Sequence, residues 1–159
     1  MQKKALLVAN PYNEEELNLI KAFELENDLG NSLTLHLQQI SGCYSKDEYE
    51  QLLKKSNELE QYLFLDEEGK IVECCSITAY RDIKSCYLSL SPSKKIIRSK
   101  KILSLATEYA FKLGMLEIFA TANIYDRALH EVLEIDGYEN LGEENGVISF
   151  VKSFEIEES

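Results

Sequence analysis

Hydrophobic residues follow two different periods along the chain, and the change between them divides it into elements. An apolar run over residues 4–8 is typical of a strand. Beyond it, Asn13 and three glutamates form a helix-start signal, and apolar residues at three- and four-residue spacing continue this helix until near Gly30. Residues 32–44 fit either a strand or a helix, whereas the capping-box sequence at residues 45–48 predicts the start of a further helix.

From residue 62 onward the period is that of strands. Apolar runs separated by polar turns predict an antiparallel meander of three strands, over residues 62–65, 71–80 and 85–90. A helix over residues 100–113 follows, and Gly114 is placed to end it. Because another strand is predicted over residues 116–120, this helix is expected to form a right-handed crossover between parallel strands.

The last third of the chain predicts one helix and one hairpin. The helix covers residues 125–135, and strands over 138–141 and 147–154 flank Asn145-Gly146, a strong tight-turn signal. The elements together predict an α/β (α+β) fold with a single domain over residues 1–159. Its central sheet is expected to be mixed, mostly antiparallel, with about six to seven strands flanked by about four helices.

Composition narrows the classes of function. The 159 residues are 45% hydrophobic and carry a formal net charge of −11 at pH 7. Such an acidic balance argues against nucleic acid or an anionic membrane as a partner. No apolar stretch approaches the roughly 20 residues that cross a bilayer, and the first apolar run is too short for a signal peptide. We therefore expect a cytoplasmic protein.

The four cysteines lack the CxxC spacing of metal sites; they are Cys43, Cys74, Cys75 and Cys86. Neighbouring residues on a strand point to opposite faces, so Cys74 and Cys75 are poorly placed to bind one metal ion. We expect reduced, mostly buried thiols and no metal site. Neither histidine is placed by the sequence to activate a cysteine, which disfavours a Cys–His hydrolase.

Five of the 17 basic residues lie within eight positions, between a predicted strand and a predicted helix: Lys94, Lys95, Arg98, Lys100 and Lys101. A helix N-terminus presents unpaired N–H groups and the positive end of a dipole, and is a natural anion site. Cations are locally unfavourable there. Their presence favours a site for a multiply charged phosphate ligand, and a solvated run of charge is the alternative.

The order of elements resembles that of the GCN5-related N-acetyltransferase (GNAT) family, most closely over residues 88–141. Leu90-Ser91-Pro92 is similar to the V-x-P step that ends the family's fourth strand. The segment from Asn123 through Ala128 to Gly137-Tyr138 resembles its N-x-x-A-x-x-x-Y-x-x-x-G-[FY] motif. The resemblance implies acetyl-CoA (coenzyme A) as co-substrate. The cofactor contacts that it implies are Leu88, Leu90, Lys94, Lys95, Arg98, Ser99, Lys100 and Asn123.

Two departures from the family pattern concern the site itself. No glycine occurs between Gly69 and Gly114, although the family's [RQ]-x-x-G-x-[GA] loop uses glycines to bring its backbone close to the pyrophosphate. Leu133 stands where many relatives have a tyrosine that protonates the departing thiolate. Candidate catalytic residues are Tyr125 and His130, with packing and surface roles as their alternatives. Glu73 is a candidate general base, with a solvent-facing carboxylate as its alternative.

Two functions follow from this interpretation. The first is an acetyl-CoA-dependent N-acetyltransferase that transfers an acetyl group directly to a primary amine. Acid-rich segments near residues 14–16, 47–48 and 143–144 favour a cationic small-molecule or peptide acceptor. The second is a catalytically degenerate GNAT-fold protein that acts as an acyl-CoA-binding sensor or interaction module. A homodimer is left open by the sequence.

Overall fold

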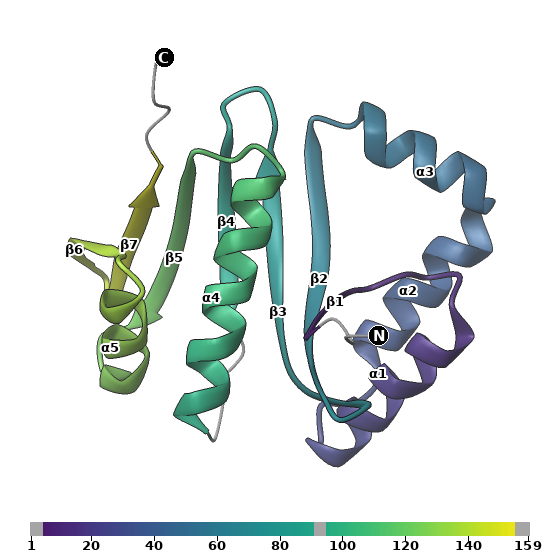
Figure 1. Ribbon diagram of the computed structural model, residues 1–159, viewed down its shortest axis with the longest axis horizontal. Helices are drawn as coiled ribbons and strands as arrows, with labels where there is room; N and C mark the ends of the chain where they lie inside the picture. Colours follow the sequence, from purple (N-terminus) through teal and green to yellow (C-terminus); the bar gives the residue numbers. More distant parts are fainter. Residues whose placement is uncertain (1–4, 91–94, 155–159) are drawn as a thin grey trace.

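The computed structural model describes residues 5–90 and 95–154 of the chain. Within them, strands and helices follow one another as Figure 1 shows. The strands are β1 (Leu6–Val8), β2 (Glu58–Glu67), β3 (Lys70–Tyr80), β4 (Ser85–Leu90), β5 (Glu117–Asn123), β6 (Glu139–Glu144) and β7 (Val147–Ser153). The helices are α1 (Glu14–Glu26), α2 (Ser32–Cys43), α3 (Lys46–Lys55), α4 (Ile96–Lys112) and α5 (Arg127–Ile135).

The seven strands form one sheet in the order β1-β2-β3-β4-β5-β7-β6. Every neighbouring pair is antiparallel except β4 and β5, which run parallel and are connected through α4. Antiparallel neighbours need only a short turn, whereas a parallel pair needs a crossover. The predicted mixed, mostly antiparallel sheet with its single crossover is therefore confirmed.

Helices pack on both faces of the sheet, in two separate clusters. Buried residues of α4 and α5, among them Leu103 and Leu133, share one core with Leu63 of β2. Buried residues of α1 and α2, such as Ile20, share a second core with Phe64 of β2. Because adjacent strand residues point to opposite faces, the two cores lie on opposite sides of the sheet. Figure 1 shows α4 and α5 together in front of the sheet, with α1, α2 and α3 toward the β1 edge.

Several local predictions are confirmed at the level of hydrogen bonds. The Asn13 side chain accepts from the Glu16 N–H, and Ser45 and Glu48 form the reciprocal capping box of α3. Asn145 and Gly146 both have positive φ, at 53° and 80°, as a tight hairpin turn with right-handed strand twist requires.

Other boundaries differ from the prediction for physical reasons. Residues 32–43 form a helix, because Leu33, Leu37 and Ile40 share one side of it and pack in the same core as α1. The alternation of apolar and polar residues in this segment therefore does not reflect a strand. β2 begins at Glu58, four residues early, because its outward polar residues hid the alternation. α4 also begins four residues early, at Ile96, because its N-cap Lys95 offers no side-chain capping signal. This places Arg98 and Ser99 in the first helical turn rather than in a loop.

The start of α2 is capped from another helix. The Glu24 carboxylate of α1 is 1% exposed and accepts from the backbone N–H groups of Leu33 (3.1 Å) and Thr34 (2.9 Å), and from the Thr34 hydroxyl. The N-cap residue Asn31 makes no side-chain capping bond of its own. A buried carboxylate thus joins α1 to α2 and supplies the negative charge that a helix N-terminus favours.

Replacing Glu24 by alanine should lower the free energy of unfolding by about 2–4 kcal/mol, because it leaves buried N–H donors without an acceptor. Urea unfolding measures this change. Glu26→Ala is the matched control, since Glu26 lies in the same helix but forms an exposed ion pair with Lys70 and should contribute about 0.5 kcal/mol. Equal losses in the two variants would contradict the capping role of Glu24.

Candidate active site

The parallel pairing between β4 and β5 stops before either strand ends. Its last pair is Leu88 with Ala120, yet β4 continues to Leu90 alongside β3, and β5 continues to Asn123 alongside β7. In the described part of the chain, no strand pairs with these two ends on the sides that face each other. We call this region the wedge and the Leu88–Ala120 pair its vertex; Figure 1 shows the lower ends of β4 and β5 apart.

The two faces of the sheet differ at the vertex. On the side of α4 and α5, Leu88 and Ala120 are buried in the larger core. On the opposite side, Tyr87 is 55% exposed, and Ser89 and Thr121 are exposed as well. A ligand chain in the wedge would therefore be covered on one side by helices and reachable from solvent on the other.

The N-terminus of α4 provides a site for negative charge near the end of β4. Its N-cap, Lys95, makes no side-chain capping bond, and the first turn contains no acidic residue. The N–H groups of Arg98 and Ser99 point back to the Lys95 carbonyl oxygen, whereas those that precede them have no acceptor within the helix. This arrangement suits a phosphate oxygen as an acceptor.

The basic residues of this region do not all face the same way. The Arg98 guanidinium donates to the Glu67 carboxylate at 3.3 Å, and both side chains are about one-third exposed. Arg98 and Lys101 line a cavity of about 580 Å³ beside Asp66, Glu67 and Glu68. Lys100 is exposed, and Lys94 and Pro92 lie outside the described residues. Arg98 is therefore already paired with an acidic residue, which its position in the sequence did not reveal.

Asn123, Tyr125 and His130 meet at the end of β5, beside the wedge. The Asn123 side-chain oxygen accepts from the Tyr125 N–H at 2.9 Å, and the main-chain carbonyl oxygen of Asn123 lies 2.8 Å from His130 Nε2. A carbonyl oxygen only accepts, so Nε2 is the donor, and Nδ1 carries the lone pair in the neutral ring. The Tyr125 side chain, by contrast, is 89% exposed and precedes α5 instead of belonging to it.

Glu73 lies apart from this group. It is 7% exposed and pairs with Leu65 on the face that α4 covers, so the alternative of a solvent-facing carboxylate is wrong. The vertex residue Leu88 pairs with Ile77, four residues from Glu73 along β3. At about 3.3 Å per residue, Glu73 is about 13 Å from the vertex, beyond the last described residue of β4.

Leu133 is fully buried in the core that also contains Leu88 and Ala120, and its side chain has no proton to donate. His130 lies one turn earlier on the same side of the helix, closer to the end of β5. Local sequence signals do not favour it over Tyr125, because the contact with Asn123 forms only when β5 and α5 fold against each other.

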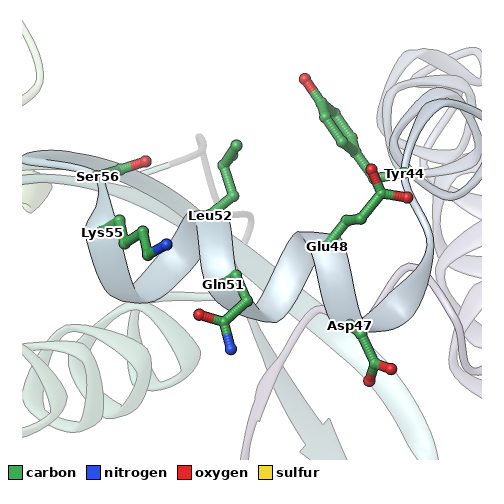
Figure 2. Close-up of a pocket in the computed structure, with 7 residues that line it drawn as sticks. All are labelled: Tyr44, Asp47, Glu48, Gln51, Leu52, Lys55 and Ser56. Atoms are coloured by element: carbon green, nitrogen blue, oxygen red, sulfur yellow. The ribbon is translucent and has the colours of Figure 1, made fainter.

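A further hollow lies on the surface of α3. It has a volume of about 560 Å³, and Figure 2 shows that its lining residues belong to α3 and its immediate flanks. None of the residues of α3 is buried. The helix is attached at its ends, where Tyr12 donates to the carbonyl oxygens of Tyr44 and Ser45 and Arg81 donates to those of Lys54 and Ser56. None of the residues that line this groove belongs to β4 or β5, so the groove is separate from the wedge.

Features of two other classes of protein are missing from the described residues. Among them, no three His, Cys, Asp or Glu side chains gather as a metal-ligand set. Within the same part of the chain, no helix has the length and apolar character that spanning a membrane requires.

Comparison of the sequence with known proteins finds no matching family model and no matching curated protein. The structure, in contrast, is similar to solved acetyltransferases. N-acetyltransferase PseH from Campylobacter jejuni superimposes with a TM-score of 0.61 at 13% identity, over 94% of this chain and 99% of that one. The ribosomal-protein-S5-alanine acetyltransferase from Vibrio fischeri superimposes with a TM-score of 0.65 at 14% sequence identity, over 96% of this chain and 95% of that one.

A point mutant of spermidine N-acetyltransferase SpeG from Vibrio cholerae gives a TM-score of 0.60 at 12% identity, over 93% of this chain and 94% of that one. Identities this low establish the fold alone. The chain has the GNAT fold, as the motifs around residues 88–141 predicted.

The thiols near the wedge are unreactive by environment. Burial raises the pKa of Cys86 to about 12, and burial together with neighbouring Cys74 raises the pKa of Cys75. Of the cysteines, only Cys43 is exposed. A thiolate is the nucleophile, so a buried, protonated thiol does not act as one at neutral pH.

Alkylation of the folded protein with iodoacetamide at pH 8 should therefore modify one of the four thiols, and Cys43→Ser should abolish the reaction. Intact-mass spectrometry counts the adducts, and labelling in urea gives the full number as a control. Rapid modification of Cys86 in the native protein would contradict the burial described.

Proposed function

We propose that this protein is an acetyl-CoA-dependent N-acetyltransferase that transfers an acetyl group directly to a primary amine. The wedge below the Leu88–Ala120 vertex, followed by the N-terminus of α4 with no capping bond from the Lys95 side chain, is the observation that supports it. The likeness to three acetyltransferases is consistent with the same reaction class, and PseH has also been solved in complex with acetyl coenzyme A.

Acetyl-CoA fits the groups present at this site. Its pantetheine arm contains amides, and the facing backbone edges of residues 88–90 and 121–123 lack strand partners of their own among the described residues. Its phosphates suit the first-turn N–H groups of α4, with Lys95, Ser99 and Lys100 close by in the same turn. In this proposal Lys94 and Arg98 add charge, and Arg98 exchanges Glu67 for a phosphate.

Acetyl-CoA supplies an acyl carbon with a thiol leaving group. In direct transfer a C–N bond forms, the C–S bond breaks, and one proton passes from the amine nitrogen to the thiolate sulfur. We assign this transfer to His130, which the Asn123 main-chain carbonyl orients beside the wedge: Nδ1 accepts the proton from the amine nitrogen and then donates it to the thiolate sulfur. Tyr125 remains a second candidate at the same strand end. Glu73, which lies toward the cofactor's phosphate end, would affect cofactor binding more than proton transfer.

The acceptor in this proposal is a cationic primary amine on a small molecule or a peptide. Acidic residues are frequent in the first turns of α1 and α3 and along β6. They would raise the local concentration of a cation through long-range attraction. The name of SpeG as a spermidine acetyltransferase is consistent with such a substrate in this fold.

A binding protein without turnover is the alternative function. Leu133 in place of a proton donor, and the absence of glycine between Gly69 and Gly114, are the two features that favour it. It predicts binding of acyl-CoA with no release of thiol for any amine.

Acetyl-CoA at 100 times its dissociation constant should stabilise the protein by about 2.7 kcal/mol, measured as a thermal shift. The variant with Lys94, Lys95 and Arg98 all replaced by alanine should bind at least about tenfold more weakly, because three cations near the phosphates are lost. Lys46, Lys54 and Lys55 of α3, replaced together by alanine, remove the same charge elsewhere and serve as the control. Equal affinity in both triple variants would contradict this phosphate site.

His130→Gln keeps a side-chain amide that can donate to the Asn123 carbonyl but removes the imidazole ring. We expect kcat for thiol release to fall by about 10²-fold or more, with KM for acetyl-CoA and the melting temperature little changed. A lower kcat at an unchanged melting temperature indicates loss of the proton donor, whereas a lower melting temperature would indicate loss of structure. An unchanged kcat would assign the proton transfer to Tyr125 or to water.

A further inference from the structure

The open face of the sheet at the vertex carries an ordered row of side chains. Cross-strand partners point to the same face, so the register defines the row from β2 to β6. It consists of Glu60, Thr78, Tyr87, Phe119, Val151 and Glu139. We call this the vertex row; its middle members, Tyr87 and Phe119, stand one residue before the vertex on the solvent side.

Tyr87 and Phe119 form an aromatic pair at the point where an acceptor must enter. Their ring centroids are 5.8 Å apart with planes inclined by 33°. α4 and α5 cover the opposite face, so an amine approaches the closed end of the wedge from the side on which exposed Tyr87 and half-buried Phe119 lie. Exposed aromatic faces attract ammonium groups by about 0.5–1 kcal/mol each.

A carboxylate stands on the same row, two strands away. Glu60 accepts a hydrogen bond from the Tyr62 phenol at 3.0 Å, and the Tyr62 ring in turn contacts His36 of α2 edge-on, with centroids 5.5 Å apart. Burial and the Glu60 contact raise the pKa of Tyr62 to about 12, so the phenol remains a donor to Glu60. The Glu60 carboxylate is thus held in place near the wall formed by α2.

Cations are missing from this part of the sheet. The same face of the sheet has two neighbouring rows of cross-strand partners, one that includes Tyr80 and one that includes Ser76. Among the residues that the structure describes, these two rows and the vertex row contain several glutamates and no Lys or Arg. Two strand spacings separate Tyr87 from Glu60, a distance of about 10 Å. A positive group on the acceptor, one short alkyl chain from the reacting nitrogen, would match Glu60.

We propose that the vertex row selects a linear diamine-like acceptor: the reacting amine lies against the solvent side of the Tyr87–Phe119 pair, and a second ammonium group binds Glu60. This inference rests on the proposed acetyl transfer and specifies its substrate class. Tyr87, Phe119 and Glu60 act as specificity residues, since none of them exchanges a proton with the acceptor. The preference for a diamine comes from the positive charge at the far end of the acceptor, which meets Glu60, and from its alkyl chain, which lies along Thr78.

Three probes of equal chain length test the proposal: 1,6-diaminohexane, hexylamine and 6-aminohexanoate differ only in the group at the distal end. Titration calorimetry should rank the diamine first and the amino acid last, with at least about a tenfold difference between them. The ranking of kcat/KM for thiol release from acetyl-CoA should be the same. Equal binding of the three probes would overturn the proposal.

Variants with matched controls identify the residues. Tyr87→Leu and Glu60→Gln should each weaken diamine binding by about three- to fivefold or more, and Tyr87→Phe should retain it. Phe111→Leu removes another exposed aromatic that pairs with Phe154, and Glu134→Gln removes an exposed charge from α5; neither should change the affinity. Wild-type diamine affinity in both Tyr87→Leu and Glu60→Gln would overturn the assignment.

The two levels of the proposal fail differently. If the diamine binds through Tyr87 and Glu60 but acetyl-CoA gives no thermal shift, the amine site is supported and the transferase function is overturned. If acetyl-CoA binds and 6-aminohexanoate is acetylated as well as the diamine, the transferase function is supported and the vertex row as its selector is overturned.

Discussion

The backbone pairing between β4 and β5 is the constraint on which the rest of the structure depends. A parallel pair needs a crossover, and α4 provides it, which brings a helix N-terminus back to the end of β4. Because pairing stops at Leu88 and Ala120 while each strand remains attached to its outer neighbour, the two strands part without loss of the sheet. The same backbone feature therefore creates unpaired amide edges and places a positive helix end beside them.

Side chains then determine what this common backbone can do. The family resemblance implies a loop rich in glycine, whereas this chain has charged and branched residues there and an α4 that starts at Ile96. Charge at the helix start can replace close backbone approach, and in the proposed complex the Arg98–Glu67 ion pair competes with the contribution of Arg98 to this charge. On α5, His130 lies one turn from the buried Leu133 and nearer to the strand end.

Much of the fold could be predicted from the sequence because local signals agreed with the tertiary arrangement. Asn13, the Ser45–Glu48 box and the Asn145-Gly146 turn each satisfy nearby backbone groups, so their effect is visible in a few residues. The segment 32–44 and the true start of α4 could not be predicted, since Leu37 is helical by contact with α1 and Lys95 carries no capping signal. Strand alternation placed Tyr87 opposite Leu88, but which face stays open depends on where α1, α2, α4 and α5 pack. The Arg98–Glu67 contact joins residues 31 apart and has no local signature.

A crystal structure of the protein with a non-transferable acetyl-CoA analogue tests the central claim most directly. The account predicts that the pantetheine arm lies between residues 88–90 of β4 and 121–123 of β5, with the pyrophosphate on the first-turn N–H groups of α4. A complex in which β4 and β5 remain as they are and the analogue binds elsewhere, for example in the groove on α3, would contradict it.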